Sequence, residues 1–332
     1  MDTKPISDEE ITYYSAITDR RVEWLWYPYI PYGKLTLLQG DPGDGKSTFM
    51  LQLVARITTK RKMPDGKPFP ECQNVIYQCS EDNPNDTIKP RLIAAGADCD
   101  RVAFISEESR GLTIDDRRVE DAIVRTQARL CVFDPIQAYI PPDSDMLNAA
   151  KMRAVMKRLA GVAERTRCAI VLIGHMTKTT SGKNLYRGLG SIDIAAVARS
   201  VLMIERDPED SSIRYMFPVK SSLAHEGCAI RFMFDKLFGF QFLGTSNYKS
   251  TSDPEVENNS KSLRTERLIR VMLAEGEKPS KFVMERIKET GISEHTVRMV
   301  AQRIGVRHFR KGTIWCWAID QGNQPMEDID DG

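Results

Sequence analysis

The sequence has no feature that would indicate a membrane-spanning, secreted or zinc-binding protein. Its apolar runs, such as AIVLIG, are too short to cross a bilayer, and the first ten residues, MDTKPISDEE, are polar and acidic, unlike a signal peptide. The seven cysteines are scattered and odd in number, and none forms a C-x-x-C pair. This pattern favours a reducing compartment and argues against a cysteine-based metal framework. We therefore expect a cytoplasmic protein without a membrane partner.

The chain also lacks an excess of charge of either sign, but the balance is uneven along the sequence. The formal net charge of the 332 residues is +1. Residues 262–319 hold eight Arg and four Lys against six Glu, whereas residues 320–332 hold five acids and no base. A basic module with an acidic end indicates a polyanion partner, although a solvated surface would show the same balance.

Apolar segments of strand length alternate with segments of helical periodicity between residues 34 and 175. The expected strands are KLTLLQG, NVIYQCS, RVAFIS, RLCVFD and CAIVLIG. This alternation predicts an α/β fold with a mostly parallel central sheet and helices on its faces. After residue 198, the segments ARSVLMIER, IRYMFPVK, CAIRFMFD and GFQFLG follow one another with only turns between them. They predict an antiparallel extension of the sheet.

Composition divides the chain into two domains. We expect the first domain at residues 1–244, with residues 1–33 packing on it as an N-terminal segment. Residues 245–261 are polar and aperiodic, as in a linker. A small second domain is expected at 262–319, followed by an acidic tail at 320–332 that we expect to be disordered.

The stretch GDPGDGKST matches the phosphate-binding pattern G-x-x-x-x-G-K-[ST], with Gly40, Gly45, Lys46 and Ser47 at the fixed positions. A strand precedes this loop and a helix begins at its end, so several backbone N–H groups can face one anion at the positive end of a helix. Lys46 would reach the β- and γ-phosphates, and the Ser47 hydroxyl would hold Mg²⁺. The pattern predicts ATP and Mg²⁺ as ligands, and nucleotide binding without turnover remains an alternative. The residues expected to form the nucleotide site are Gly40, Asp41, Pro42, Gly43, Asp44, Gly45, Lys46, Ser47 and Thr48.

Turnover needs an acid near the metal and a base that positions water. Asp134 ends the buried strand RLCVFD, at the Walker B position, and the next residue is Pro135 rather than a glutamate. We expect the base to be Glu81, at the tip of the strand that follows the phosphate-loop helix, on an adjacent parallel strand. The alternative role for Glu81 is capping of the next helix, for which Asp82 is better suited.

A third strand ends at His175, where a sensor of the γ-phosphate would stand, although a lone histidine is more often structural. The following stretch, MTKTTSGKNLYRGLGS, is polar, glycine-rich and basic. We expect it to contact single-stranded DNA through Lys178, Lys183 and Arg187, with disordered filler as the alternative.

These motifs together resemble the RecA-like P-loop ATPases, and within them the RepA-type hexameric replicative helicases of plasmids, phages and mobile elements. The resemblance covers about residues 20–245 and includes VEWLWYPYIPYGKLTLLQGDPGDGKST, QCSEDNPNDTIKPRL, YRGLGSIDIAAVARSVL and VKSSLAHEG. It implies a RecA-like ATPase domain at 1–244. By this resemblance the catalytic residues are Lys46, Glu81, Asp134 and His175, with Ser47 and Asp134 at the metal.

The resemblance also implies that Arg91 lies near the adenine and that Lys220 reaches into the site of a neighbouring subunit. Related helicases carry Lys-x-Arg at this place, with the arginine acting on the neighbour's γ-phosphate, whereas this chain has Lys220-Ser221-Ser222. Such an arginine can be worth several powers of ten in rate. Either Lys220, Arg187 or Arg199 acts in its place, or turnover is slow and the protein is a switch.

Residues 262–319 predict a winged helix. Three segments of helical spacing, TERLIRVMLAEG, SKFVMERIKETG and ISEHTVRMVAQRIG, precede VRHFRKGTIWCWAI, which predicts a hairpin. Ser293 is expected to cap the third helix, and Trp315 and Trp317 are expected to pack under the wing. The N-terminal aromatic residues are expected to pack against the sheet of the first domain.

The exposed face of the third helix indicates binding of duplex DNA by Arg298, Gln302 and Arg303, with Lys311 of the hairpin on phosphates. A protein-docking domain is the alternative. The whole chain therefore predicts an ATP-dependent DNA-acting ATPase, a ring-forming replicative helicase or translocase that is a homo-oligomer. The resemblance to hexameric helicases implies a hexamer. The alternative is a nucleotide-gated DNA-binding loader or regulator that does not unwind DNA.

Overall fold

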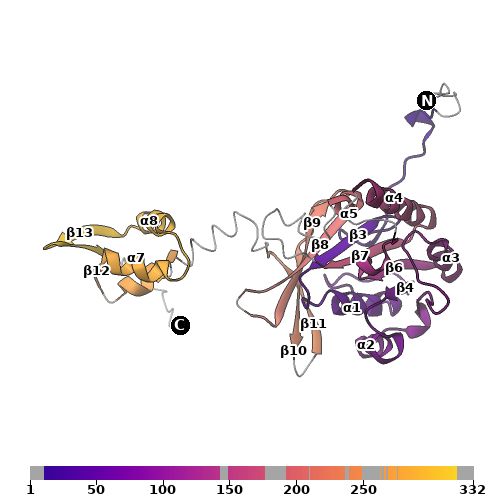
Figure 1. Cartoon of the computed structure of the whole chain (residues 1–332), viewed down its shortest axis with the longest axis horizontal. Coiled ribbons are helices and arrows are strands. Elements are labelled where there is room, and N and C mark those ends of the chain that lie inside the picture. Colours follow the sequence, from indigo (N-terminus) through magenta and orange to yellow (C-terminus); the bar gives the residue numbers. More distant parts are fainter. Residues whose placement is uncertain are drawn as a thin grey trace, which may run out of the picture. The chain divides into compact units, whose positions relative to one another are not determined.

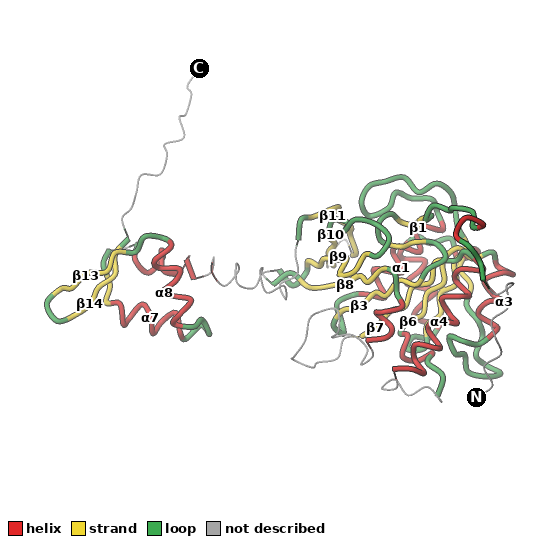
Figure 2. The backbone as a smooth tube through the Cα atoms, turned by 90° about the horizontal axis from the view of Figure 1, so that it is seen from above, coloured by secondary structure: helices red, strands yellow, loops and turns green. Residues whose placement is uncertain are grey.

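The computed structural model describes residues 11–142, 149–175, 192–208, 210–235, 239–248, 262, 265, 266, 268–274 and 276–319. The chain divides into two compact units, Met1–Tyr248 and Lys249–Gly332 (Figures 1 and 2). Each unit has its own apolar core. Among the described residues, no helix is long and apolar enough to span a membrane.

A nine-stranded sheet forms the centre of the first unit, in the order β11-β10-β9-β8-β3-β7-β6-β4-β5. Its strands are β3 (Leu35–Gly40), β4 (Asn74–Cys79), β5 (Val102–Ala103), β6 (Ala128–Asp134), β7 (Ala169–His175), β8 (Ser200–Arg206), β9 (Ile213–Ser221), β10 (Ala229–Asp235) and β11 (Gly239–Ser246). The strands from β8 to β5 are parallel, and β9, β10 and β11 are antiparallel to their neighbours. The predicted mostly parallel sheet with an antiparallel extension is confirmed.

One boundary of that prediction was wrong. The segment ARSVLMIER was assigned to the antiparallel run, but β8 is parallel to β3 and only its other edge is antiparallel, to β9. The physical reason is the connection, because a helix rather than a turn precedes β8, and crossovers join parallel strands.

Helices cover both faces of the sheet (Figure 1). They are α1 (Lys46–Thr58), α2 (Lys89–Ala95), α3 (Arg117–Thr126), α4 (Ala149–Thr166) and α5 (Ile192–Val197). Short helical turns lie at Tyr14–Ala16, Pro84–Ile88, Cys99–Arg101 and Ile136–Tyr139. Leu38 of β3 packs with α1 on one face, whereas Leu35 and Leu37 pack with α3 and α4 on the other. Burial on both faces explains why the strands are continuous apolar runs.

The N-terminal aromatic residues belong to a small two-stranded sheet of β1 (Trp24–Trp26) and β2 (Ile30–Pro31). Trp26 and Tyr29 are buried in the core beside the main sheet, as predicted. Tyr27 is 50% exposed, so the prediction was wrong for this residue, which lies in the turn between the two strands.

The second unit contains a helical stretch that includes residues 268–273, then β12 (Lys278–Pro279), α7 (Ser280–Lys288), α8 (Glu294–Arg303), β13 (Arg307–Lys311) and β14 (Ile314–Ala318). Its three strands are antiparallel in the order β12-β14-β13. Ser293 caps α8 as predicted, because its hydroxyl accepts a hydrogen bond of 3.2 Å from the Thr296 backbone N–H. The hairpin turns at Gly312, whose φ of +62° suits glycine.

The two tryptophans of β14 have different environments. Trp317 is buried with the helices, whereas Trp315 is 57% exposed. The prediction that both pack under the wing was therefore wrong for Trp315. It lies nearer the hairpin turn, where the strand pair extends past the core.

Candidate nucleotide site

The carboxyl ends of five parallel strands, β8, β3, β7, β6 and β4, lie at one edge of the sheet. Gly40, the first glycine of the phosphate-binding pattern, pairs with His175 of β7 on one side and with Ile204 of β8 on the other. Asp134, at the end of β6, pairs with Cys79 of β4. The strand ends that were predicted to carry the site therefore lie together. The structure describes the strand position of His175 but not its side chain.

The strand that precedes Glu81 is not adjacent to the strand of the phosphate loop, so this expectation was wrong. Two strands, β7 and β6, separate β4 from β3. The expectation followed sequence order, whereas crossover connections allow later strands to insert between earlier ones. Glu81 reaches the same edge nevertheless, because all four strands are parallel.

The phosphate loop has the backbone that an anion cradle requires. Gly43 and Gly45 have φ values of +79° and +87°, a region that favours glycine, and α1 begins at Lys46 directly after the loop. The Asp44 carboxylate accepts a hydrogen bond of 3.0 Å from the Asp41 backbone N–H. The loop is therefore held in its curled shape by its own side chain as well as by its glycines.

Lys46 lies in the loop with its side chain buried. Its Nζ donates hydrogen bonds of 2.9 Å to the carbonyl oxygens of Gly40 and Asp41. Burial lowers the pKa of Lys46, and the nearby carboxylates of Asp44 and Asp134 oppose that shift. An ammonium held by neutral carbonyls can transfer its hydrogen bonds to phosphate oxygens, which are stronger acceptors because they are charged.

A salt bridge ties the loop to the end of β8. The Arg206 Nε donates to the Asp44 carboxylate at 2.7 Å, and the same guanidinium donates to the Gly43 carbonyl at 2.8 Å. Asp44 is only 6% exposed, so its charge is compensated inside the structure. Sequence analysis did not identify Arg206, which lies far from the motif in the chain.

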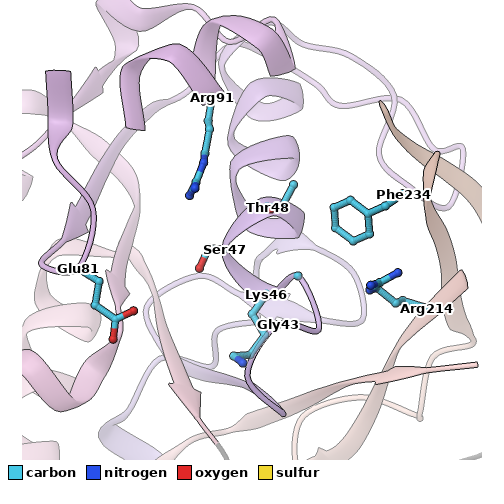
Figure 3. A pocket seen from close by; sticks show the side chains of 9 residues that line it. Gly43, Lys46, Ser47, Thr48, Glu81, Arg91, Arg214 and Phe234 are labelled. Carbon is cyan, nitrogen blue, oxygen red and sulfur yellow. The ribbon is translucent and has the colours of Figure 1, made fainter. Parts of the chain in front are cut away.

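Arg214 of β9 and Phe234 of β10 form a wall of the loop pocket that sequence analysis also missed. The Arg214 guanidinium lies 4.5 Å from the centre of the Phe234 ring and points toward the loop (Figure 3). It donates to the backbone carbonyls of Ser211 and Ser212 at 3.1 and 2.9 Å. The Phe234 ring is so close to Gly45 that a Cβ there would lie 2.6 Å from it.

These elements enclose a pocket of about 380 Å³ (Figure 3). It is lined by Gly43, Gly45, Lys46, Ser47, Thr48, Glu81, Arg91, Arg214 and Phe234. The pocket thus joins the phosphate loop to Glu81 and Arg91, which the sequence placed at the same site. Gly40, Asp41, Pro42 and Asp44 belong to the loop but do not line the pocket, and neither does Asp134.

Arg91 is held at the pocket by Asp82. Its guanidinium donates to the Asp82 carboxylate at 2.7 Å. The sequence favoured Asp82 as the cap of the following helix, and this expectation is wrong. The cap is Asn83, whose side chain accepts from the Asn85 backbone N–H at 2.8 Å.

Asp134 is 4% exposed at the end of β6. Its carboxylate accepts a hydrogen bond of 2.6 Å from the hydroxyl of Tyr77 on the neighbouring strand β4. Burial, and next the charge of Asp134, raise the pKa of Tyr77 well above its ordinary value. Tyr77 therefore remains a neutral donor to Asp134 over the ordinary pH range.

Lys220 of β9 contacts its own chain. Its Nζ donates to the carbonyls of Ala195, Ala196 and Ala198 at 2.9, 3.1 and 2.8 Å. These carbonyls are the acceptors at the end of α5, where a cation is favourable. Lys220 is thus the C-terminal cap of that helix.

Arg199 and Lys220 lie at the edge of the sheet opposite the phosphate loop. Arg199 is exposed and immediately precedes Ser200, which pairs with Thr36 near the start of β3. Thr36 and Gly40 are separated by roughly 13 Å along the strand, at about 3.3 Å per residue. Neither cation can therefore serve the nucleotide pocket of its own chain.

The residues predicted to contact duplex DNA are exposed in the second unit, and three of them form surface ion pairs. Gln302 lies on the exposed face of α8. The ion pairs are Arg298–Glu294 at 2.7 Å, Arg303–Glu266 at 3.0 Å and Lys311–Glu277. Exposed pairs of this kind are worth at most about 1 kcal/mol, so phosphates can displace them. Lys178, Lys183 and Arg187 lie outside the residues that the structure describes.

DNA repair proteins match part of the chain by sequence. DNA repair protein RadA of Halalkalibacterium halodurans is 30% identical over 148 residues, which are 44% of this chain and 28% of that protein. DNA repair protein RadA of Streptococcus pneumoniae is 27% identical over 148 residues, 44% of this chain and 31% of that protein. The match therefore spans less than a third of the length of these relatives.

Two solved structures are similar in backbone. The ATPase domain of G40P aligns with a TM-score of 0.49 at 12% identity, over 64% of this chain and 85% of that one. A KaiC-like protein of Pyrococcus horikoshii aligns with a TM-score of 0.46 at 17% identity, over 64% of this chain and 90% of that one.

The family model described as AAA domain matches residues 5–181, more than half of the 332 residues. The matched segment contains the phosphate loop, Glu81, Asp134 and His175, whose strand ends the structure brings to one edge of the sheet. The chain therefore belongs to the AAA domain family.

Proposed function

We propose that the protein hydrolyses ATP to act on DNA, as a ring-forming replicative helicase or translocase of a mobile element. The observation that carries the proposal is the pocket that joins Lys46 and Ser47 to Glu81. A phosphate cradle with a carboxylate across it is the arrangement that ATP hydrolysis requires, because water must be positioned opposite the leaving phosphate.

Each residue of the pocket has a role in this proposal. The Lys46 ammonium exchanges its two loop carbonyls for phosphate oxygens. Glu81 orients the attacking water and accepts its proton, and His175 senses the γ-phosphate from the strand next to the loop. The Ser47 hydroxyl and the Asp134 carboxylate would hold Mg²⁺ and its water. When bound, Mg²⁺ neutralises phosphate charge and stabilises the leaving group.

The fit of Mg-ATP is supported by the loop itself. The buried Lys46 has only neutral carbonyl acceptors in the contacts described above, and Gly45 leaves no space between the loop and Phe234 for any side chain. Arg91 and Phe234 also line the pocket, and a guanidinium plane and an aromatic ring suit a flat base. Arg214, of the same chain, supplies positive charge to the phosphates.

Action on DNA is supported by two observations. The relatives matched by sequence are named DNA repair proteins. The second unit presents basic residues on α8 and β13, and its sequence of helix, strand, two helices and hairpin is that expected of a winged helix. We propose that this unit binds duplex DNA and that the loop with Lys178, Lys183 and Arg187 contacts the single strand.

Assembly into a homo-oligomer is supported by the place of Arg199 and Lys220. Because both lie at the sheet edge opposite the loop of their own chain, they can act on a nucleotide only in a neighbouring subunit. Residues from two chains would then complete each site, as in a ring.

One observation favours the alternative of a nucleotide-gated loader or regulator. Lys220 makes three hydrogen bonds to its own helix, and serine stands at position 222, where related helicases carry an arginine. A chain without a trans-acting cation would bind ATP and change state with little turnover.

The two candidate functions can be distinguished by measuring ATP hydrolysis and oligomeric mass, each with and without single-stranded DNA. A motor should release phosphate faster with the single strand and should form a larger species with ATP. A monomer whose slow hydrolysis does not respond to DNA would support the loader or regulator.

A further inference from the structure

The second unit contains a groove that the proposed duplex contacts do not explain. Its volume is about 750 Å³, roughly twice that of the nucleotide pocket. One wall is a face of α7, the second is the first part of α8, and the third is the inner face of the β13–β14 hairpin. The lining residues are Ser280, Lys281, Met284, Glu285, Lys288, Glu294, Arg298, His308, Trp315 and Trp317.

The hairpin wall presents an aromatic surface. Trp315 and Trp317 lie two residues apart on β14 and so face the same side. Trp317 is buried against the core, and the His308 ring lies 4.9 Å from it. Trp315 continues this surface outward and is 57% exposed, and among the described residues no ring packs against it. A large indole on a groove wall offers a face on which another flat group can stack.

The helix walls supply positive charge. Lys281, Met284 and Lys288 lie on one face of α7, at helical spacings of three and four residues. Arg298 of α8 completes the cationic side. The acids of the groove, Glu285 and Glu294, lie beside Lys281 and Arg298, at 3.9 and 2.7 Å.

Lys288 is the cation of this groove that has no ion pair with an acid in the part of the chain that the structure describes. The groove therefore combines a free ammonium group with an exposed indole. A flat apolar surface beside positive charge matches a nucleobase and its phosphate. An apolar peptide would need aliphatic lining, of which Met284 is the single example here.

We propose that this groove binds unpaired bases of single-stranded DNA, with one base stacked on Trp315 and the adjoining phosphates at Lys281 and Lys288. This site is additional to the duplex contact that we propose for α8. Arg298 borders both surfaces, so a duplex on α8 would place its unpaired end at the groove. The second unit would then bind a junction between duplex and single strand.

The test uses the full chain and two labelled DNAs, a blunt duplex and the same duplex with a single-stranded overhang. Trp315→Ala should weaken binding of the overhang DNA by about 5- to 100-fold, the value of one stacked base, and leave the blunt duplex unchanged. The matched control is Ile314→Ala, because Ile314 is 54% exposed on the opposite face of the same strand.

The charged side of the groove has its own control. Lys288→Gln should weaken the overhang complex and reduce its salt dependence, whereas Arg286→Gln should not, because Arg286 lies on the same helix outside the groove and pairs with Glu289. Melting temperatures of the four variants show that the unit remains folded.

A second measurement locates the base. Iododeoxyuridine in the overhang should crosslink to Trp315 on irradiation, and mass spectrometry identifies the peptide. Equal overhang binding by Trp315→Ala and Ile314→Ala, or crosslinks confined to the first unit, would overturn the proposal. Loss of blunt-duplex binding by Trp315→Ala, with Ile314→Ala unaffected, would also overturn it, because the indole would then contact the duplex rather than an unpaired base.

Discussion

The hydroxyl of Tyr77 donates a hydrogen bond of 2.6 Å to the carboxylate of Asp134, from the adjacent strand. Asp134 is almost completely buried, so this donor stabilises a charge that burial opposes. It also holds the carboxylate in one orientation. The residue predicted to hold the metal shell is therefore positioned by a neighbour for which the sequence has no motif.

Tyr77→Phe should lower the free energy of unfolding by about 1–3 kcal/mol, because it removes a donor from a buried carboxylate. It should also raise the Mg²⁺ concentration needed for half-maximal hydrolysis. Urea denaturation and a Mg²⁺ titration measure the two effects. The control is Tyr215→Phe, which removes a partly buried hydrogen bond to Asp207 between two residues that do not line the pocket.

The contribution of the Tyr77–Asp134 hydrogen bond to folding stability should fall at high pH. Burial raises the pKa of Tyr77 above its unfolded value of about 10. The parent therefore keeps this contribution to stability below pH 10 and loses it as the pH rises further. The stability difference between the parent and Tyr77→Phe should shrink above about pH 10, and a constant difference would contradict the assignment.

Glu81→Gln should bind ATP like the parent and fail to hydrolyse it, because the amide keeps the shape of the carboxylate but cannot accept a proton. Lys46→Ala is the companion variant, since it removes the charge directed at the phosphates and should abolish turnover. Fluorescent-nucleotide binding and phosphate release separate the two. Hydrolysis at the parent rate by Glu81→Gln would show that another group is the base.

Arg214→Ala should weaken ATP binding by about 10- to 100-fold, since a charge-assisted hydrogen bond contributes about 1.5–3 kcal/mol. Arg231→Ala is a matched control, because Arg231 is a partly buried arginine on the adjacent strand that does not line the pocket. Arg214→Lys should recover part of the affinity. Equal binding by both alanine variants would leave Arg214 with a purely structural role.

Lys220→Ala mixed with Glu81→Gln should hydrolyse ATP, although each variant alone is inactive. In the mixture, a Glu81→Gln subunit can supply Lys220 to the intact pocket of its neighbour. Because Lys220 also caps α5, its removal can lower stability, so the melting temperature of Lys220→Ala is measured beside its activity. Full activity of Lys220→Ala in a monomeric sample would exclude action across an interface.

Arg298→Ala should weaken binding of preferred duplex sites by about 1–3 kcal/mol, whereas Lys311→Ala should weaken all duplexes about equally. The reason is that arginine can pair with guanine in the major groove, whereas a lysine on the hairpin meets phosphates. Competition binding with several duplexes at two salt concentrations measures both effects. If duplex binding by the full chain changes neither with salt nor with either substitution, a protein-docking role for the second unit is favoured.

Local motifs predicted the loop, the strand ends and the helix start correctly, because each depends on residues within a short segment. Glu81 was placed at the site from its position at the tip of a strand, and Arg91 by resemblance, and the structure lines the pocket with both. The position of β4 in the sheet could not be deduced, since the order of parallel strands is set by long-range packing.

Arg206, Arg214 and Phe234 were missed for the same physical reason. They follow the loop by more than 150 positions and belong to no motif. The sequence does contain one signal for Arg214. It is a charged residue within the apolar strand IRYMF, where burial requires a compensating partner. The exposure of Trp315 was missed because alternation predicts the face of a strand but not where the core beneath it ends.

The contact between Gly45 and Phe234 has a consequence for the order of synthesis. A ribosome releases the complete GDPGDGKST motif when most of the first unit has still to be made. The ring that packs against this loop, and the arginine beneath the ring, emerge only after strands β9 and β10 have been translated. A nascent chain therefore carries the motif well before it carries a finished pocket.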